Sequence, residues 1–408
     1  MTLIWTLVAI FAFCWVLWRV SVHYDLRARR ASLRGRVVWV TGASSGIGRA
    51  LAFRLAVFYG ARVVVSARRV ELLESLAAQV SEALAGKATA STDTREMDKP
   101  AVVIEPVNLR ASGNELDHVL QRVLQLGVSV VILNAGVNQN GCLFVDTSLD
   151  TLREVLETNL WAPARILHRL LRELLSAPNE PTKASGHNCS VDVNRTRSRA
   201  RKSKPSPSSS GIPEHRARLK IVDAFRDLLQ TKIPASCRPS DQQASTKDII
   251  ASAPNESSAL VENLDVVVVS SLAAYRALPG GALYGATKAA LNYLTESLRM
   301  ELRIAGDHRV RLVTVCPGFV DTPAIAHQRH WKPCCLSPDA AADHIIWALL
   351  RRGDHYGFPW IMDHIVMAVA VWIPTRVYRW IMAKSWRPPA SAESAVCTIH
   401  HGSAHVEH

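Results

Sequence analysis

The chain has 408 residues, of which 48% are hydrophobic and 20% charged, with a formal net charge of +13. This composition excludes a wholly disordered protein and supplies enough apolar side chains for one large or two ordinary domains. The eight cysteines include no Cys-x-x-Cys pair with matching histidines, so we expect no metal site and no dense disulfide framework. Net charge alone does not choose between nucleic acid, an anionic membrane and an anionic cofactor as partners.

The chain begins with an apolar segment that predicts a membrane anchor. Residues 1–18 contain no charged side chain, and a helix of that length would span about 27 Å, close to a hydrocarbon core of about 30 Å. We therefore predict an N-terminal transmembrane anchor over residues 1–22. A cleaved signal peptide is the alternative, although no basic region precedes the apolar run and no small-residue cleavage site follows it.

The charges beyond this segment predict its orientation. Arginines from Arg19 to Arg36 favour a cytosolic position for the domain that follows, by the positive-inside rule. Asn-x-Ser/Thr patterns would matter only if that domain faced a lumen, and they occur at Asn188, Asn194 and Asn255.

Residues 36–69 predict a nucleotide-binding βαβ unit, because an apolar strand, a glycine-rich turn, an amphipathic helix and a second apolar strand follow one another. The turn, TGASSGIG at 41–48, would bring backbone N–H groups and a helix N-terminus against a pyrophosphate. The predicted cofactor contacts in this turn are Gly42, Ser44, Ser45, Gly46, Ile47 and Gly48.

The end of the second strand predicts which dinucleotide is bound. An NAD site usually offers an acid to the ribose hydroxyls here, but this chain has Arg68 and Arg69 after Ala67. A guanidinium would pair with a 2′-phosphate, so we predict NADP(H) as the cofactor. Two solvated arginines at a helix start are the alternative.

Strands and helices continue to alternate as far as residue 355. We predict strands over 102–108, 266–271 and 310–318, a strand and turn over 128–136, and helices over 113–125, 150–176, around Tyr284 and from about 338. Near-continuous apolar strands predict a parallel sheet that is covered on both faces. The expected fold is an α/β, Rossmann-like doubly wound sheet in a single catalytic domain, residues 36–355, with its sites at the C-terminal ends of the strands.

The run GALYGATKAALNYL at 281–294 contains a candidate catalytic pair. Tyr284 and Lys288 lie four residues apart and so share one helical face, although two ordinary surface residues would have the same spacing. A free phenol has a pKa of about 10, which is poorly matched to proton transfer at neutral pH. We expect the positive charge of Lys288 to lower the pKa of Tyr284.

Six motifs occur in the order that is found in short-chain dehydrogenases/reductases, which the chain resembles: TGASSGIG at 41–48, NAG at 134–136, Asn159, Ser271, YGATK at 284–288 and PGFVDT at 317–322. DTSLD at 146–150 and a Trp-rich C-terminal segment further resemble the membrane-anchored dehydrogenase/reductase member-seven group. The resemblance implies an enzyme that moves a hydride between a nicotinamide and a carbonyl or secondary alcohol.

The resemblance also implies four catalytic residues. Tyr284 would exchange a proton with the substrate oxygen, and Lys288 would additionally bond the nicotinamide ribose. Ser271 would polarise the carbonyl, and Asn159 would hold a water that links Lys288 to solvent. A strand-end cap for Ser271 and a backbone-bonded side chain for Asn159 are the alternatives.

Further cofactor contacts are implied at Asn108, Asn134, Ala135, Gly136, Pro317, Gly318, Val320 and Thr322. Two of these positions depart from the family pattern. The single asparagine of LNAG replaces the usual pair, and Asn108 stands where relatives commonly have an aspartate. We expect these departures to alter cofactor affinity at most.

Two segments fall outside the family pattern. Residues 178–262 form a predicted insertion, mostly disordered, whose basic Ser/Pro-rich part at 195–211 is expected to be a solvated linker and not a nucleic-acid site, because no aromatic residues interleave with its charges. Residues 356–388 are Trp-rich and suit a membrane-interfacial segment, with an ordinary packing extension as the alternative. Residues 389–408 are expected to be a flexible tail.

We therefore expect a membrane-bound, NADP(H)-dependent oxidoreductase, at the endoplasmic reticulum with its catalytic domain facing the cytosol. Its substrate would be an apolar carbonyl or alcohol such as a steroid, a retinoid or another lipid, and a homodimer through the long helices is an option. The alternative is a catalytically inactive membrane-anchored scaffold that binds partners through the basic insertion.

Overall fold

The computed structural model describes residues 30–88, 100–110, 113–139, 142–176, 263–325, 332, 334–351 and 353–385. The chain divides into two units, residues 1–178 with 257–408 and residues 179–256, and all the described residues belong to the first unit. The predicted anchor, the 178–262 insertion, the 389–408 tail and the three Asn-x-Ser/Thr sites lie outside the described residues. Within the described part of the chain, no helix is long and apolar enough to cross a bilayer.

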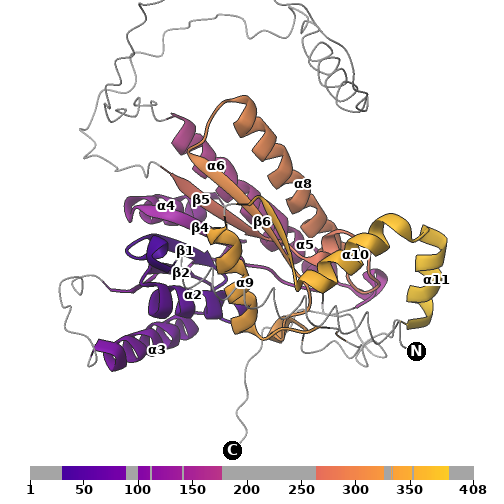
Figure 1. Ribbon diagram of the computed structural model, residues 1–408, viewed down its shortest axis with the longest axis horizontal. Coiled ribbons are helices and arrows are strands. Elements are labelled where there is room, and N and C mark those ends of the chain that lie inside the picture. Colours follow the sequence, from indigo (N-terminus) through magenta and orange to yellow (C-terminus); the bar gives the residue numbers. More distant parts are fainter. Residues whose placement is uncertain are drawn as a thin grey trace, which may run out of the picture. The chain divides into compact units, whose positions relative to one another are not determined.

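The described residues form one parallel sheet with strand order β3-β2-β1-β4-β5-β6-β7 (Figure 1). The strands are β1 Val37–Thr41, β2 Arg62–Ser66, β3 Val102–Ile104, β4 Val128–Leu133, β5 Leu264–Val269, β6 Val310–Pro317 and β7 His355–Phe358. The helices are α2 Gly46–Tyr59, α3 Val70–Ala88, α4 Gly113–Gln125, α5 Leu149–Leu156, α6 Ala162–Ser176, α8 Ala282–Ile304, α9 Pro338–Leu350, α10 Trp360–Trp372 and α11 Thr375–Ser385.

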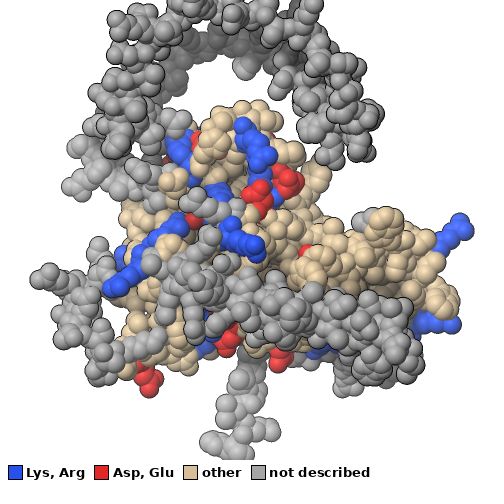
Figure 2. Space-filling model, in the orientation of Figure 1, with Lys and Arg blue, Asp and Glu red and all other residues tan. Residues whose placement is uncertain are grey.

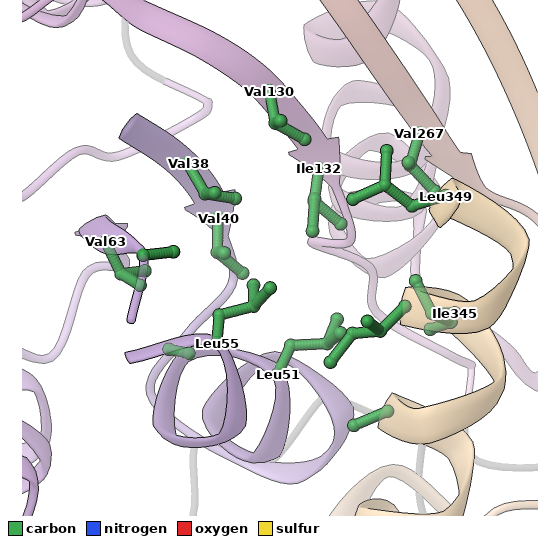
Figure 3. Packing of buried hydrophobic residues seen from close by; sticks show 14 of the residues in the cluster. Val38, Val40, Leu51, Leu55, Val63, Val130, Ile132, Val267, Ile345 and Leu349 are labelled. Atoms are coloured by element: carbon green, nitrogen blue, oxygen red, sulfur yellow. The ribbon is translucent and has the colours of Figure 1, made fainter. Parts of the chain in front are cut away.

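Successive strand residues point to opposite faces of the sheet, and this alternation builds two hydrophobic cores. In β1, Val38 and Val40 belong to the core under α2, α3 and α9, whereas Trp39 belongs to the core under α4, α6 and α8. Figure 3 shows Leu51 and Leu55 of α2 and Ile345 and Leu349 of α9 directed toward the same strand residues. Both faces are therefore covered, as the apolar strands predict.

The order of the strands places a crevice at the centre of the sheet. From β1 the chain moves outward through β2 to β3, and α4 then returns it to the other side of β1, where β4 pairs with β1. The loops that follow β1 and β4 therefore leave the sheet in opposite directions. In doubly wound folds this switch point is where ligands bind, at the C-terminal ends of the strands.

All six predicted strands are present, but two details of the prediction are wrong. The strand predicted over 102–108 ends at Ile104, although the N–H groups of Glu105 and Val107 still donate to the carbonyls of Val65 in β2 and of Ala67 just after it. The seventh strand, β7, was not predicted, and it takes residues 356–358 into the sheet. The C-terminal segment therefore leaves the sheet after Phe358 and continues as α10 and α11.

Candidate active site

The turn between β1 and α2 has the shape that the glycine motif predicts. Gly42 has a positive φ of 72°, and a Cβ atom there would lie 2.7 Å from the Cα of Ala135. A Cβ on Gly48 would lie 2.3 Å from the carbonyl oxygen of Gly42. Ser45, the N-cap residue of α2, makes no side-chain hydrogen bond to the helix. The first N–H groups of α2 are thus left for an anion, and the turn fits the pyrophosphate of a dinucleotide.

Hydrogen bonds join this turn to the loop that follows β4. The Thr41 hydroxyl accepts from the backbone N–H groups of Asn134 and Ala135, at 3.1 Å and 3.2 Å, and the Asn134 side chain donates to the Thr41 carbonyl at 3.1 Å. The two walls of the crevice are therefore fixed to each other. The side-chain amide of Asn134 is used in this contact, so the single asparagine of the motif has a structural role.

The two arginines after β2 have different partners. Arg69 donates to the hydroxyl oxygens of Ser44 and Ser45, at 3.2 Å and 3.3 Å, so its guanidinium lies beside the glycine-rich turn. Arg68 is instead paired with Glu154 of α5 at 3.0 Å, and the carboxylate of Glu154 is largely buried. Among the described residues no acidic side chain pairs with Arg69, so Arg69 is the better placed of the two next to the predicted phosphate site.

Glu154 is a residue that the motifs did not reveal. Its carboxylate also lies 3.6 Å from Arg110, so one buried acid holds two arginines near the end of β2. Asn108 lies in the same region, where its side-chain oxygen accepts from the N–H of Arg110. The pairing of Arg68 with Glu154 spans 86 positions of sequence, and no local pattern signals it.

Ser271, Tyr284 and Lys288 meet at the C-terminal end of β5. Ser271 follows this strand, and its hydroxyl accepts from the N–H of Ala273 at 3.1 Å and lies close enough to the Tyr284 phenol to lower the pKa of that phenol. One turn of α8 separates Tyr284 from Lys288, whose Nζ lies 5.8 Å from the centre of the phenol ring. Lys288 is only 3% exposed, and its Nζ donates to the Val269 carbonyl at 2.9 Å. The sequence-based expectation that these side chains converge is thus consistent with the geometry.

The protonation of this pair differs from the expected one. Burial raises the pKa of the Tyr284 phenol, the hydrogen bond from Ser271 lowers it, and the nearby Cys316 thiol raises it. Burial likewise lowers the pKa of Lys288 to about 8, with an opposing contribution from Cys316. The expected lowering of the Tyr284 pKa is not found, because burial is the largest influence on this pKa and raises it. The phenol is protonated at neutral pH.

Asn159 lies in a π-helical turn, η3, over Glu157–Trp161, and not in the continuous α-helix that was predicted over 150–176. Its side chain accepts from the Val137 N–H and donates to the Val137 carbonyl, both at 2.8 Å. A Cβ on Gly136 would lie 3.5 Å from both the Asn159 Oδ1 and the Lys288 Nζ. Asn159 is therefore close to the lysine, but its amide clamps the loop after β4. Single π turns are frequent at functional sites.

The segment after β6 closes the crevice from the opposite side. Thr322 lies against the glycine-rich turn, since a Cβ on Gly46 would be 3.0 Å from its methyl group. The Pro317 carbonyl accepts from Ser271 at 3.5 Å, and the Gly318 N–H donates to the Phe358 carbonyl at 2.7 Å. Val320 is buried and pairs with Leu336. The residues predicted from PGFVDT thus border both the glycine-rich turn and the Ser271 loop.

A scan against protein families matches the short chain dehydrogenase family over residues 36–183 and 261–333, which leaves 184–260 unmatched. The human protein named dehydrogenase/reductase SDR family member 7 is 36% identical over 129 residues, 31% of this chain and 34% of that protein. A 3-ketodihydrosphingosine reductase of Aspergillus fumigatus is 31% identical over 172 residues, 41% of this chain and 43% of that enzyme. The chain thus spans less than half the length of these relatives.

The fold also has counterparts among solved structures. A short-chain dehydrogenase from Sphingobium yanoikuyae, solved in complex with NADPH, superposes with a TM-score of 0.50 at 19% identity. The superposition covers 88% of this chain and 98% of that one. At this identity the likeness concerns the fold.

The buried lysine predicts a pH dependence of stability. Between pH 8 and about 10 the unfolded chain, where lysine titrates near 10.5, holds a proton that Lys288 in the folded protein has released. Stability rises with pH wherever the unfolded state binds more protons, so the free energy of unfolding should rise by about 1.4 kcal/mol per pH unit in this range, relative to Lys288→Met. Urea unfolding between pH 7.5 and 10 measures the difference.

The exposed lysine of α11 provides the control, since Lys384→Met should follow the wild-type curve. A constant difference between wild type and Lys288→Met over this pH range would show that the buried amine does not lose its proton there.

Proposed function

Because the chain belongs to the short chain dehydrogenase family, which uses a nicotinamide cofactor, we propose that it is an NADP(H)-dependent oxidoreductase that interconverts a carbonyl and a secondary alcohol on an apolar substrate. The observation that carries this proposal is the meeting of Ser271, Tyr284 and Lys288 at the end of β5, beside a glycine-rich turn that fits a pyrophosphate. A scaffold protein would need neither feature.

The protonation of the site supports a role in carbonyl reduction. A phenol that keeps its proton at neutral pH can donate it to a substrate oxygen, and Ser271 can donate a hydrogen bond to the same oxygen as charge develops on it. The bound dinucleotide would supply the hydride. The phenolate left on Tyr284 would then be stabilised by the ammonium of Lys288, which is charged below a pH of about 8.

The direct test is Tyr284→Phe, which removes the phenol hydroxyl and with it the transferable proton. We expect the variant to lose about 10²- to 10⁴-fold in kcat for NADPH-dependent reduction of a panel of apolar ketones, while its affinity for NADPH changes little. Tyr293→Phe is the matched control, because Tyr293 lies on the same helix and is 82% exposed. The scaffold alternative would be favoured if wild type and Tyr284→Phe gave equal signals with every carbonyl.

The preference for NADP(H) is proposed to depend chiefly on Arg69. Its guanidinium lies beside Ser44 and Ser45, whereas Arg68 is held by the buried carboxylate of Glu154. Hydrogen bonds to charged groups contribute about 1.5–3 kcal/mol, so Arg69→Ala should raise the KM for NADPH roughly 10- to 100-fold and leave the KM for NADH nearly unchanged.

Arg68→Ala is the comparison variant and should have the smaller effect on the preference between the two cofactors. Steady-state kinetics with both cofactors measure the ratio. An Arg69→Ala variant with an unchanged ratio, or a wild type that prefers NADH, would refute the assignment.

The exposed surface of the C-terminal helices α10 and α11 supports the proposal that the substrate is apolar and comes from a membrane. Trp372 and Trp380 are 80% and 60% exposed, and Figure 2 shows the surface of α10 and α11 as mostly uncharged, with basic side chains at its outer edge. Arg276 donates to the carbonyls of Ala370 and Ile373 at the end of α10, and the Tyr378 hydroxyl donates to the Ala277 carbonyl. These bonds tie the helices to the loop between Ser271 and Tyr284. We propose that α10 and α11 rest in the membrane interface.

A photo-cross-linking amino acid introduced into the full chain in place of Trp372 tests this proposal. In membranes it should label phospholipid, whereas the same probe in place of Ile304, which is 87% exposed at the far end of α8, should not. Equal labelling at both positions, or no labelling at position 372, would refute this proposal. It would favour the alternative that α10 and α11 are an ordinary packing extension.

A further inference from the structure

The helix that carries Tyr284 has no capping side chain of its own. Gly281 occupies its N-cap position and makes no side-chain hydrogen bond, and the residues before it, Pro279 and Gly280, offer no hydroxyl or carboxylate. The first N–H groups of a helix need partners from outside the helix. The catalytic helix must therefore be capped by another part of the chain.

Gln139 supplies that cap. Its side-chain oxygen accepts from the N–H of Leu283 at 3.0 Å and from the N–H of Tyr284 at 3.4 Å. These are the second and third residues of α8, the positions that an N-cap side chain normally satisfies. The bond from Gln139 thus reaches the backbone of the proposed proton donor itself.

The carboxamide of Gln139 is held firmly in place. The residue is only 1% exposed, and its Nε2 donates to the Cys142 carbonyl at 3.2 Å. Two N–H donors face the other end of the group, so the orientation of the amide follows from its partners. A buried amide that is hydrogen-bonded at both its oxygen and its nitrogen is costly to disturb.

Gln139 also belongs to the loop that follows β4. Asn134 and Ala135 of this loop are bonded to Thr41 beside the glycine-rich turn, and Val137 is clamped by Asn159. One short stretch of backbone therefore contacts the cofactor side of the crevice at its start and the N-terminus of α8 at its end.

We propose that Gln139 is a positioning residue for the reaction: through the N-terminal turn of α8 it sets where the Tyr284 hydroxyl lies relative to Ser271 and the substrate oxygen. The expected effect of Gln139 on kcat rests on the proposed function. Its structural readout, the protection of the Leu283 and Tyr284 amides, does not depend on activity.

Gln139→Met tests the proposal, because methionine is similar in size and cannot accept these hydrogen bonds. Hydrogen–deuterium exchange of residues 282–286 should become about tenfold faster than in wild type, and kcat should fall roughly 10- to 100-fold, as expected for a misplaced catalytic group. The KM for NADPH should change less than about twofold, since the glycine-rich turn is untouched.

Gln139→Glu is the rescue variant, because a buried carboxyl that keeps its proton can accept from Leu283 and Tyr284 with one oxygen and donate its O–H to the Cys142 carbonyl, as Nε2 does in wild type. It should restore slow exchange and most of kcat. Gln121→Met, at an exposed position of α4, is the control for the substitution itself and should match wild type in both measurements.

A Gln139→Met variant with a lower melting temperature but with the kcat and pH profile of wild type would reduce Gln139 to a structural cap and overturn the proposal. If that variant does not fold, a Gln139→Glu variant in which the Leu283 and Tyr284 amides exchange fast while kcat stays at the wild-type value overturns it equally. A wild-type protein without turnover on any carbonyl would instead defeat the proposed function, and the exchange measurements would still decide whether Gln139 caps α8.

Discussion

The contact between the Lys288 ammonium and the Val269 carbonyl is the interaction on which the site depends. An ammonium group with almost no exposure to water is costly unless it finds a hydrogen-bond acceptor, and here the acceptor is the last residue of β5. The bond fixes a side chain of α8 against the strand that leads directly to Ser271. The positions of the serine, the tyrosine and the lysine therefore follow from one strand end and one helix.

The same burial that orders these groups sets their chemistry. Removal from solvent favours the uncharged form of each partner, so the phenol holds its proton more firmly and the amine holds its proton less firmly than in water. Lys288 therefore changes between its charged and neutral forms at a pH close to the physiological range. A change in packing around β5 would therefore change the pKa values of Tyr284 and Lys288.

The sequence predicted most of the fold because the information is local. Near-continuous burial within apolar strands such as β1 and β4 is visible as runs of valine and isoleucine, and glycines with a required conformation mark the first turn. β7 was missed, since four residues with a single fully buried side chain do not form a recognisable strand pattern. The motif order located Ser271, Tyr284 and Lys288, but not how burial shifts their protonation.

The contacts that were not predicted join distant parts of the chain. Gln139 meets Leu283 across 144 positions, and Arg68 meets Glu154 across 86. Neither partner has a local signature, although the absence of a capping side chain before α8 is visible in PGGALYG and shows that some partner is required. The π turn at Asn159 is likewise invisible, because the periodicity of the surrounding apolar residues is that of an ordinary helix.

The place where the long unmatched stretch joins the sheet bears on how this protein can diverge. The chain leaves α6 after Ser176 and re-enters the sheet at Leu264, seven residues before Ser271, a separation of roughly 20 Å along an extended strand. Both junctions therefore lie at the rim of the sheet that is remote from the chemistry. Changes of length and composition between the two junctions therefore need not alter the site, and this rim is a convenient place to insert a reporter.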